Sequence, residues 1–150
     1  MNIKHLALSL LLAATAIGSA QAFDKYTINR DDLPQAAREF LTEHFPKGRV
    51  SMVKTDKHLL KKTDYDVKLV NGTKIEFNNA GKWTSVDCKT REVPASLIIK
   101  PIRNYIKKNF PDTYVTKIEK KTFGFEIELS DGIELKFDRL GTFKSMEMDD

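Results

Sequence analysis

Cysteine is almost absent from this chain of 150 residues. Cys88 is the single cysteine, so the chain can form no internal disulfide and the fold must be stabilised by its hydrophobic core. We interpret Cys88 as a half-buried, inert thiol, and pairing with a second chain is the alternative.

Motifs for catalysis are also missing. His44 and His58 have no partner at the spacing of a metal site, and the chain contains no GxSxG elbow, glycine-rich phosphate loop or CxxC pair. The one cysteine has no evident base to activate it. The sequence therefore predicts a protein that is not an enzyme and has no catalytic residues.

No apolar run is long enough to cross a bilayer, because the N-terminal run from Leu6 to Ile17 has only 12 residues. This run follows Lys4 and precedes the small-residue cleavage site Ala20-Gln21-Ala22. We interpret residues 1–22 as a signal peptide and residues 23–150 as a single domain. The sequence thus predicts a periplasmic or secreted protein without membrane insertion.

Charge of one sign is in small excess, because 25 Lys and Arg stand against 21 Asp and Glu and leave a net charge of +4. Loss of Lys4 with the signal peptide would lower it to +3, since 4 − 1 = 3. A surplus of this size, in an exported chain, does not indicate a nucleic-acid partner.

What the chain does contain is an internal repeat, in which the segment from Leu33 to Val86 recurs as Ile98 to Met146. Apolar residues in each copy follow the i, i+4, i+7, i+8 spacing of an amphipathic helix. They are Leu33, Ala37, Phe40, Leu41 and Phe45 in the first copy, and Ile98, Ile102, Tyr105, Ile106 and Phe110 in the second. Pro46 and Pro111 end the two predicted helices.

Alternating apolar residues after each helix predict antiparallel strands. A three-residue loop at Val70-Asn71-Gly72, with Gly72 in the left-handed conformation, keeps these residues on one face. It sets Leu69 opposite Thr73, Val67 opposite Ile75 and Tyr65 opposite Phe77. A similar turn at Asn79-Ala80-Gly81 sets Phe77 opposite Trp83.

The predicted fold class is α+β. We expect two tandem repeats, at about residues 31–88 and 92–150, each a helix followed by a four-stranded antiparallel meander. Together they would form one eight-stranded sheet with both helices packed on one face.

The other face of this sheet would be open and charged. The register displays on it Asp66, Lys68, Lys74, Glu76, Lys82, Thr84 and Val86 from the first copy, and Glu126, Glu128, Glu134, Lys136, Thr142, Lys144 and Met146 from the second. It sets Asp66 opposite Glu76, Lys68 opposite Lys74 and Glu128 opposite Glu134, and such like-charge pairs are mildly unfavourable. The alternatives are a plain solvated surface and a surface that binds a partner.

Acidic residues also suggest calcium. Asp64 and Asp66, with Glu147, Asp149 and Asp150 at the C-terminus, could supply oxygen ligands, but no twelve-residue calcium loop occurs. Solvated strand edges and a solvated tail explain the same residues. The sequence leaves a metal site undefined.

The doubled pattern resembles the PepSY-like family of secreted bacterial proteins. The residues that carry the resemblance are Leu33-Pro34 and Val93-Pro94, Phe45-Pro46 and Phe110-Pro111, and the hairpins from Phe77 to Trp83 and from Phe137 to Phe143. The resemblance implies a fold similar to the β-lactamase inhibitory protein, whose concave sheet grips an enzyme. PepSY domains also occur in metallopeptidase propeptides, and some PepSY-like proteins are described as calcium-regulated. The inhibitor's fold uses disulfides, which a chain with only Cys88 cannot form.

These observations predict a non-enzymatic binding module that inhibits or modulates an exported enzyme through the open sheet face, without a cofactor. The partner would be an exported protein or peptide. The residues expected to bind it are Asp66, Lys68, Lys74, Glu76, Thr84, Glu126, Glu128, Glu134, Lys136 and Lys144. The alternative function is a calcium-responsive periplasmic sensor.

Overall fold

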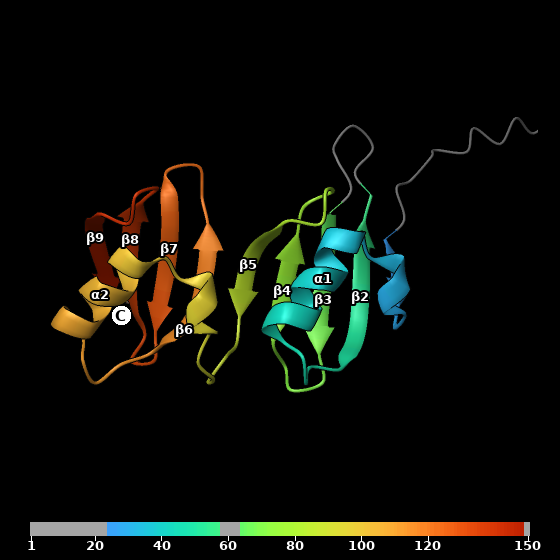
Figure 1. Ribbon diagram of the computed structural model, residues 1–150, viewed down its shortest axis with the longest axis horizontal. Coiled ribbons are helices and arrows are strands. Elements are labelled where there is room, and N and C mark those ends of the chain that lie inside the picture. The colour runs from blue at the N-terminus through green and yellow to red at the C-terminus, as the bar shows by residue number, and fades with distance from the viewer. Residues whose placement is uncertain (1–23, 58–63, 149–150) are drawn as a thin grey trace, which may run out of the picture.

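The computed structural model describes residues 24–57 and 64–148 (Figure 1). The predicted signal peptide lies outside the described residues, as do His58, Asp149 and Asp150.

One antiparallel sheet dominates the fold, and each strand pairs with its neighbours in the chain. The nine strands are β1 (Lys25–Thr27), β2 (Val50–Asp56), β3 (Asp64–Leu69), β4 (Lys74–Phe77), β5 (Trp83–Asp87), β6 (Val115–Lys120), β7 (Gly124–Leu129), β8 (Ile133–Asp138) and β9 (Phe143–Met148). Two α-helices, α1 (Gln35–His44) and α2 (Lys100–Asn109), and two 3-10 turns, Arg30–Asp32 and Ala95–Leu97, complete the described elements.

The fold predicted from the sequence is wrong in its architecture. The structure is one continuous nine-stranded sheet with two helices, rather than an eight-stranded sheet made of two tandem helix-plus-four-strand repeats with the helices packed on one face. The additional strand is β1, which pairs with Thr55, Lys54 and Val53 of β2. Its three residues carry no buried side chain, so apolar alternation gave no signal for it.

The helices are positioned by aromatic rings. Phe40 of α1 meets Phe77 of β4 edge to face, with ring centroids 5.4 Å apart. Tyr105 of α2 stacks on Phe143 of β9 at 4.8 Å. A phenylalanine follows the last residue of each helix, and the Phe45 and Phe110 N–H groups donate to the Leu41 and Ile106 carbonyls. The buried residues of the helices, Ala37, Phe40 and Leu41 in α1 and Ile102 and Ile106 in α2, belong to the apolar stripes that the sequence predicts.

The turn predicted at Val70-Asn71-Gly72 is confirmed. The Leu69 N–H donates to the Thr73 carbonyl at 2.9 Å, and Gly72 has a φ of +92°. Tyr65 then lies opposite Phe77 and Val67 opposite Ile75. This register decides which side chains of β3 and β4 enter the core and which stay outside it.

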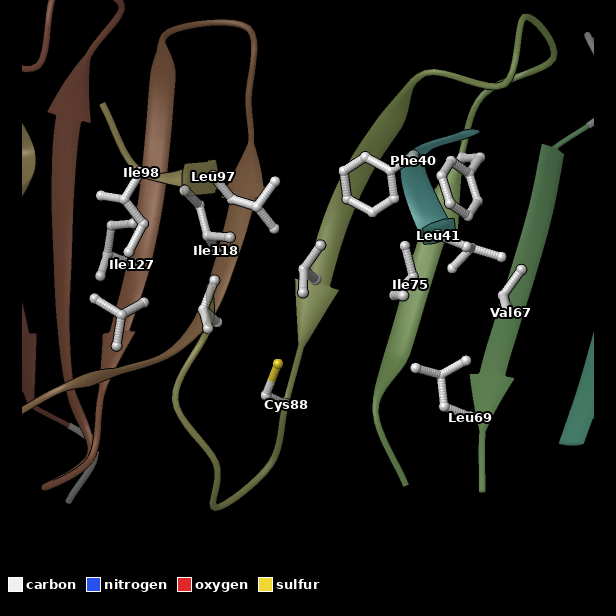
Figure 2. Packing of buried hydrophobic residues seen from close by; sticks show 14 of the residues in the cluster. Phe40, Leu41, Val67, Leu69, Ile75, Cys88, Leu97, Ile98, Ile118 and Ile127 are labelled. Carbon is white, nitrogen blue, oxygen red and sulfur yellow. The ribbon is translucent and has the colours of Figure 1, made fainter. Parts of the chain in front are cut away.

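The core is built from the buried residues of the sheet and the helices. Figure 2 shows Phe40 and Leu41 of α1 beside Ile75 and Val67, with Ile118 and Ile127 further along the sheet. Cys88, just after β5, is also buried, and desolvation raises the pKa of its thiol. The core therefore spans both parts of the sheet without a break at Cys88.

Candidate functional site: the open face of the sheet

Side chains that alternate with the buried ones form a charged surface, which we call the open face. Its side chains lie in two rows that run across the strands, each residue opposite the next. The first row is Lys54, Asp66, Glu76, Ser85, Glu119, Glu126, Lys136 and Ser145. The second row is Lys68, Lys74, Asp87, Lys117, Glu128, Glu134 and Glu147.

The structure brings most of the predicted site residues together. Eight of the ten lie in these rows, namely Asp66, Lys68, Lys74, Glu76, Glu126, Glu128, Glu134 and Lys136. The expected like-charge pairs are present, with Asp66 opposite Glu76, Lys68 opposite Lys74 and Glu128 opposite Glu134. The predicted register of β3, β4, β7 and β8 is thus confirmed.

Thr84 and Lys144 lie outside the two rows because β-bulges displace them. Phe77 pairs with Trp83 and Glu76 with Ser85, so Thr84 is an extra residue in β5. Its hydroxyl donates to the Glu76 carbonyl at 3.3 Å. Lys144 is the extra residue in β9, between the partners of Phe137 and Lys136.

The bulges also overturn the expected positions of Val86 and Met146. Each bulge shifts the following residues by one, which turns their side chains to the other face. Val86 is opposite Ile75 and fully buried, and Met146 is opposite Leu135. Lys82 and Thr142, also expected on this face, lie before β5 and β9 in the turns.

The centre of the open face comes from residues that the sequence reasoning missed. Ser85 and Asp87 of β5 pair with Glu119 and Lys117 of β6, which joins the two parts of the sheet. The signal was the alternation of Lys117 and Glu119 around buried Ile118. A register shift between Val115 and Lys117 obscured it.

The open face is acidic although the chain is basic. The two rows contain eight carboxylates and five lysines, a balance of 5 − 8 = −3. The whole chain has a net charge of +4. Positive charge is therefore concentrated elsewhere on the molecule, and the face would attract a basic surface.

Ion pairs compensate only part of this charge. Lys136 lies 2.6 Å from Glu147 and 3.7 Å from Glu134, and Lys121 lies 2.8 Å from Glu119. Within the described part of the chain, three carboxylates of the rows make no ion pair: Asp66, Glu76 and Glu128.

Asp66 and Glu76 are held in an unfavourable environment. Desolvation raises the pKa of both carboxyl groups, and the charge of Asp56 adds to the effect on Asp66. Asp66 and Glu119 likewise raise the pKa of Glu76. Both residues line a hollow of about 320 Å³, together with Asp56, Asp64, Phe77, Asn78 and Thr84.

A larger hollow of about 510 Å³ lies along α1, away from the open face. In it, the Arg30 guanidinium donates to the Arg38 carbonyl at 2.6 Å, and the buried Arg38 Nε atom has no hydrogen-bond partner among the described residues. Arg38 itself lies 3.7 Å from Asp31.

The predicted calcium ligands are not gathered in one place. Asp64 and Asp66 lie on β3, whereas Glu147 lies near the end of β9 and contacts Lys136. In residues 24–57 and 64–148, no group of three or more His, Cys, Asp or Glu side chains is arranged to hold a metal ion. The His44 Nδ1 atom lies 2.9 Å from the Ser96 hydroxyl.

The chain matches a family model described as "Putative beta-lactamase-inhibitor-like, PepSY-like" over residues 63–145. This match covers more than half of the chain, and the protein belongs to this PepSY-like family. The resemblance seen in the sequence is confirmed. No curated protein matches the chain.

Three solved structures are similar over most of the chain. A periplasmic protein of unknown function from Bacteroides vulgatus is 38% identical, with a TM-score of 0.79, over 83% of this chain and 99% of its own. A "putative calcium-regulated periplasmic protein" from Bacteroides thetaiotaomicron is 35% identical, with a TM-score of 0.78, over 83% of this chain and 96% of its own. Another periplasmic protein from Bacteroides vulgatus is 35% identical, with a TM-score of 0.77, over 87% and 99%.

These neighbours confirm the predicted periplasmic location. Among the described residues, no helix is both long and apolar enough to cross a membrane. The match to the PepSY-like family and the likeness to periplasmic proteins of unknown function suggest a non-catalytic module.

Proposed function

We propose that this protein is a non-enzymatic periplasmic binding module whose open face recognises the basic surface of an exported protein. The observation that carries the proposal is the acidic excess of the two rows in a chain of opposite net charge. Charge complementarity of this kind steers association and selects the partner.

The unpaired carboxylates support the same conclusion. Asp66 and Glu76 face each other across β3 and β4, and desolvation raises the pKa of both. Directly opposed like charges reduce stability, by about 0.2–1 kcal/mol for each pair. A cationic side chain placed between them would relieve the repulsion, so binding would recover a cost that the free protein carries.

The partner class that we favour is an exported enzyme that the module inhibits or modulates. The description of the matching family, which names an inhibitor-like protein, supports this choice. A nine-stranded sheet also presents a broad surface, and stable protein interfaces require about 800 Å² on each partner.

Affinity capture from periplasmic extract tests the proposal. The bait is the chain without residues 1–22, beside a variant with Asp66→Asn, Glu76→Gln and Glu128→Gln. The control variant carries Glu39→Gln, Glu43→Gln and Glu92→Gln, which remove the same charge from exposed positions outside the open face.

We expect a protein that the native bait and the control retain and that the open-face variant loses. Its activity, assayed with and without the module, then decides whether the module inhibits it. Equal capture by all three folded baits would refute the open face as the binding surface.

A calcium-responsive role is the second candidate. Asp56, Asp64, Asp66 and Glu76 line one hollow and carry the carboxylate ligands that calcium prefers, although the described structure does not gather them into a metal-binding group. The Bacteroides thetaiotaomicron neighbour, with its calcium-regulated description, points the same way. Calorimetric titration would show saturable heat that Asp66→Asn abolishes, and absence of heat at millimolar calcium would exclude this role.

A further inference from the structure

Three turns lie at the same end of the sheet and form a surface that the open face does not include. They are the β4–β5 turn (78–82), the β6–β7 turn (121–123) and the β8–β9 turn (139–142), at the upper end of the sheet in Figure 1. We call this end the tip. Two of its turns expose large apolar side chains, since Phe123 is 48% and Leu140 is 80% exposed.

The two apolar turns are adjacent and held together. The Arg139 guanidinium donates to the Thr122 carbonyl through Nε at 3.0 Å and Nη2 at 2.7 Å. Gly124 pairs with Asp138, and a Cβ atom on Gly124 would lie only 2.2 Å from the Phe137 carbonyl oxygen. The exposed side chains of Phe123 and Leu140 thus belong to two turns that contact each other.

The turn itself does not require a leucine at position 140. The Asp138 carboxylate accepts hydrogen bonds from the Leu140 and Thr142 N–H groups, both at 2.9 Å. The β4–β5 turn has the same arrangement around Asn78, with Ala80 in the equivalent place. Since the Asp138 and Asn78 side chains stabilise the two turns in the same way, neither turn depends on the side chain at position 140 or 80.

Cations lie in or next to the turns of the tip. Lys82, Lys120 and Arg139 form no ion pair with any residue that the structure describes, whereas Lys121 and Lys144 are paired with Glu119 and Asp138. The Lys120 ammonium lies 3.8 Å from the centroid of the Trp83 ring. Burial, and then the charge of Lys82, lower the pKa of Lys120.

We propose that the tip docks onto an anionic phospholipid surface, with Leu140 and Phe123 entering the bilayer interface. Lys82, Lys120 and Arg139 would contact the phosphates, and each cation near an anionic membrane strengthens binding about fivefold. Apolar side chains beside a basic cluster are the pattern of interfacial binding. The periplasm lies between two membranes, so such a surface is always within reach.

A membrane fits the tip better than a protein partner does. Protein interfaces need broad complementary surfaces, whereas the tip is two projecting side chains on narrow turns. A bilayer interface can deform around them and bury their apolar area. The proposal is independent of the binding of a protein to the open face.

Sedimentation with vesicles tests this docking. The chain without residues 1–22 is mixed with phosphatidylcholine vesicles that contain 30% phosphatidylglycerol or none. We expect binding to the anionic vesicles only, and a loss of binding in high salt. Leu140→Asn with Phe123→Ser should lower the partition coefficient at least tenfold, and Lys82→Gln with Lys120→Gln about 30-fold.

Two controls match these variants. Val70→Asn removes an apolar side chain that is 58% exposed in the turn at the opposite end of the sheet. Lys107→Gln with Lys108→Gln removes two exposed charges from the last turn of α2. Both controls should bind vesicles as the native chain does, and circular dichroism confirms that each variant is folded.

Fluorescence gives a direct readout of insertion. Trp83 is the only tryptophan in the sequence, so Trp83→Phe with Leu140→Trp leaves a single fluorophore at the tip. Its emission should shift to the blue when anionic vesicles are added. Absence of vesicle binding, equal loss in the α2 control, or an unshifted emission would each overturn the proposal.

Discussion

Replacing Glu76 by Gln should stabilise the fold and, at the same time, weaken the binding of a basic partner. Glu76 lies directly opposite Asp66, and desolvation together with the charges of Asp66 and Glu119 raises the pKa of Glu76. Gln has the same shape and no charge, so the substitution removes the repulsion without leaving a cavity. A residue kept at a cost to stability is expected where function requires it.

The size of the effect follows from the pairing. Directly opposed like charges on a sheet cost about 0.2–1 kcal/mol, and Glu76 is too exposed for a larger value. We therefore expect the free energy of unfolding to rise by about 0.5 kcal/mol at pH 7. For a domain of this size, the melting temperature would rise by about 2 °C.

The pH dependence of the free energy of unfolding provides an independent check on the sign of the Glu76→Gln effect. Because the folded-state pKa is raised, the charged Glu76 destabilises the fold above that pKa. As pH falls through the folded pKa to below the unfolded value, both states become protonated and the penalty disappears. The advantage of Glu76→Gln should thus be full at pH 7 and absent at about pH 3.5.

Urea denaturation at the two pH values measures this difference, and Glu147→Gln is the control. Glu147 also lies opposite a carboxylate, Glu134, but it is 2.6 Å from Lys136, so the loss of this ion pair offsets the relief of repulsion and the substitution should bring no stabilisation. The reasoning would be refuted if Glu76→Gln destabilised the chain at pH 7, or if its advantage were the same at low pH. A stabilised variant with unchanged partner binding would instead separate the repulsion from the function.

Two substitutions and one thiol reaction test the packing of the fold. Gly124→Ala should cost more than about 2 kcal/mol, seen as a lower urea midpoint, because φ is +152° and the new Cβ meets the Phe137 carbonyl; an unchanged midpoint would contradict the close approach. Phe137→Ala should cost about 3–5 kcal/mol by the same assay, since the ring is fully buried, and a cost below 1 kcal/mol would contradict that burial. The Cys88 thiol should resist a disulfide reagent at pH 8 until the protein is unfolded, because burial raises its pKa and limits access; rapid reaction of the folded protein would refute this.

Much of the open face could be predicted because turn length fixes register. Gly72 supplies the left-handed residue of a three-residue loop, and this loop alone places Asp66 opposite Glu76. The same logic places Glu128 opposite Glu134. Local turn chemistry was therefore sufficient wherever no bulge followed.

The errors arose where the backbone departs from regular pairing. Thr84 adds one residue to β5, which buries Val86 and brings Ser85 to the open face. Apolar alternation cannot reveal such a shift, because the sequence pattern is compatible with Val86 on either face of the sheet. The short strand β1 was not predicted for a related reason, since an exposed edge strand of three residues has no apolar face.

The tip was missed for a different reason. Phe123 and Leu140 are far apart in the sequence, and only the pairing of β7 with β8 brings their turns together. Lys82 and Lys120 likewise become neighbours only through the fold, as the contact of Lys120 with Trp83 shows. Surfaces built by tertiary pairing leave no local pattern in the sequence.

The two proposed surfaces are compatible because the strands run from the tip along the open face. Glu128 lies four residues from Gly124, a distance of about 13 Å along β7. This exceeds the Debye length of about 8 Å at physiological salt, so the second row would feel little repulsion from an anionic membrane at the tip. Glu126 is nearer, but Lys121 lies 4.0 Å from it. A chain docked through Leu140 and Phe123 would therefore stand with its sheet upright on the membrane and keep the open face accessible to a periplasmic partner.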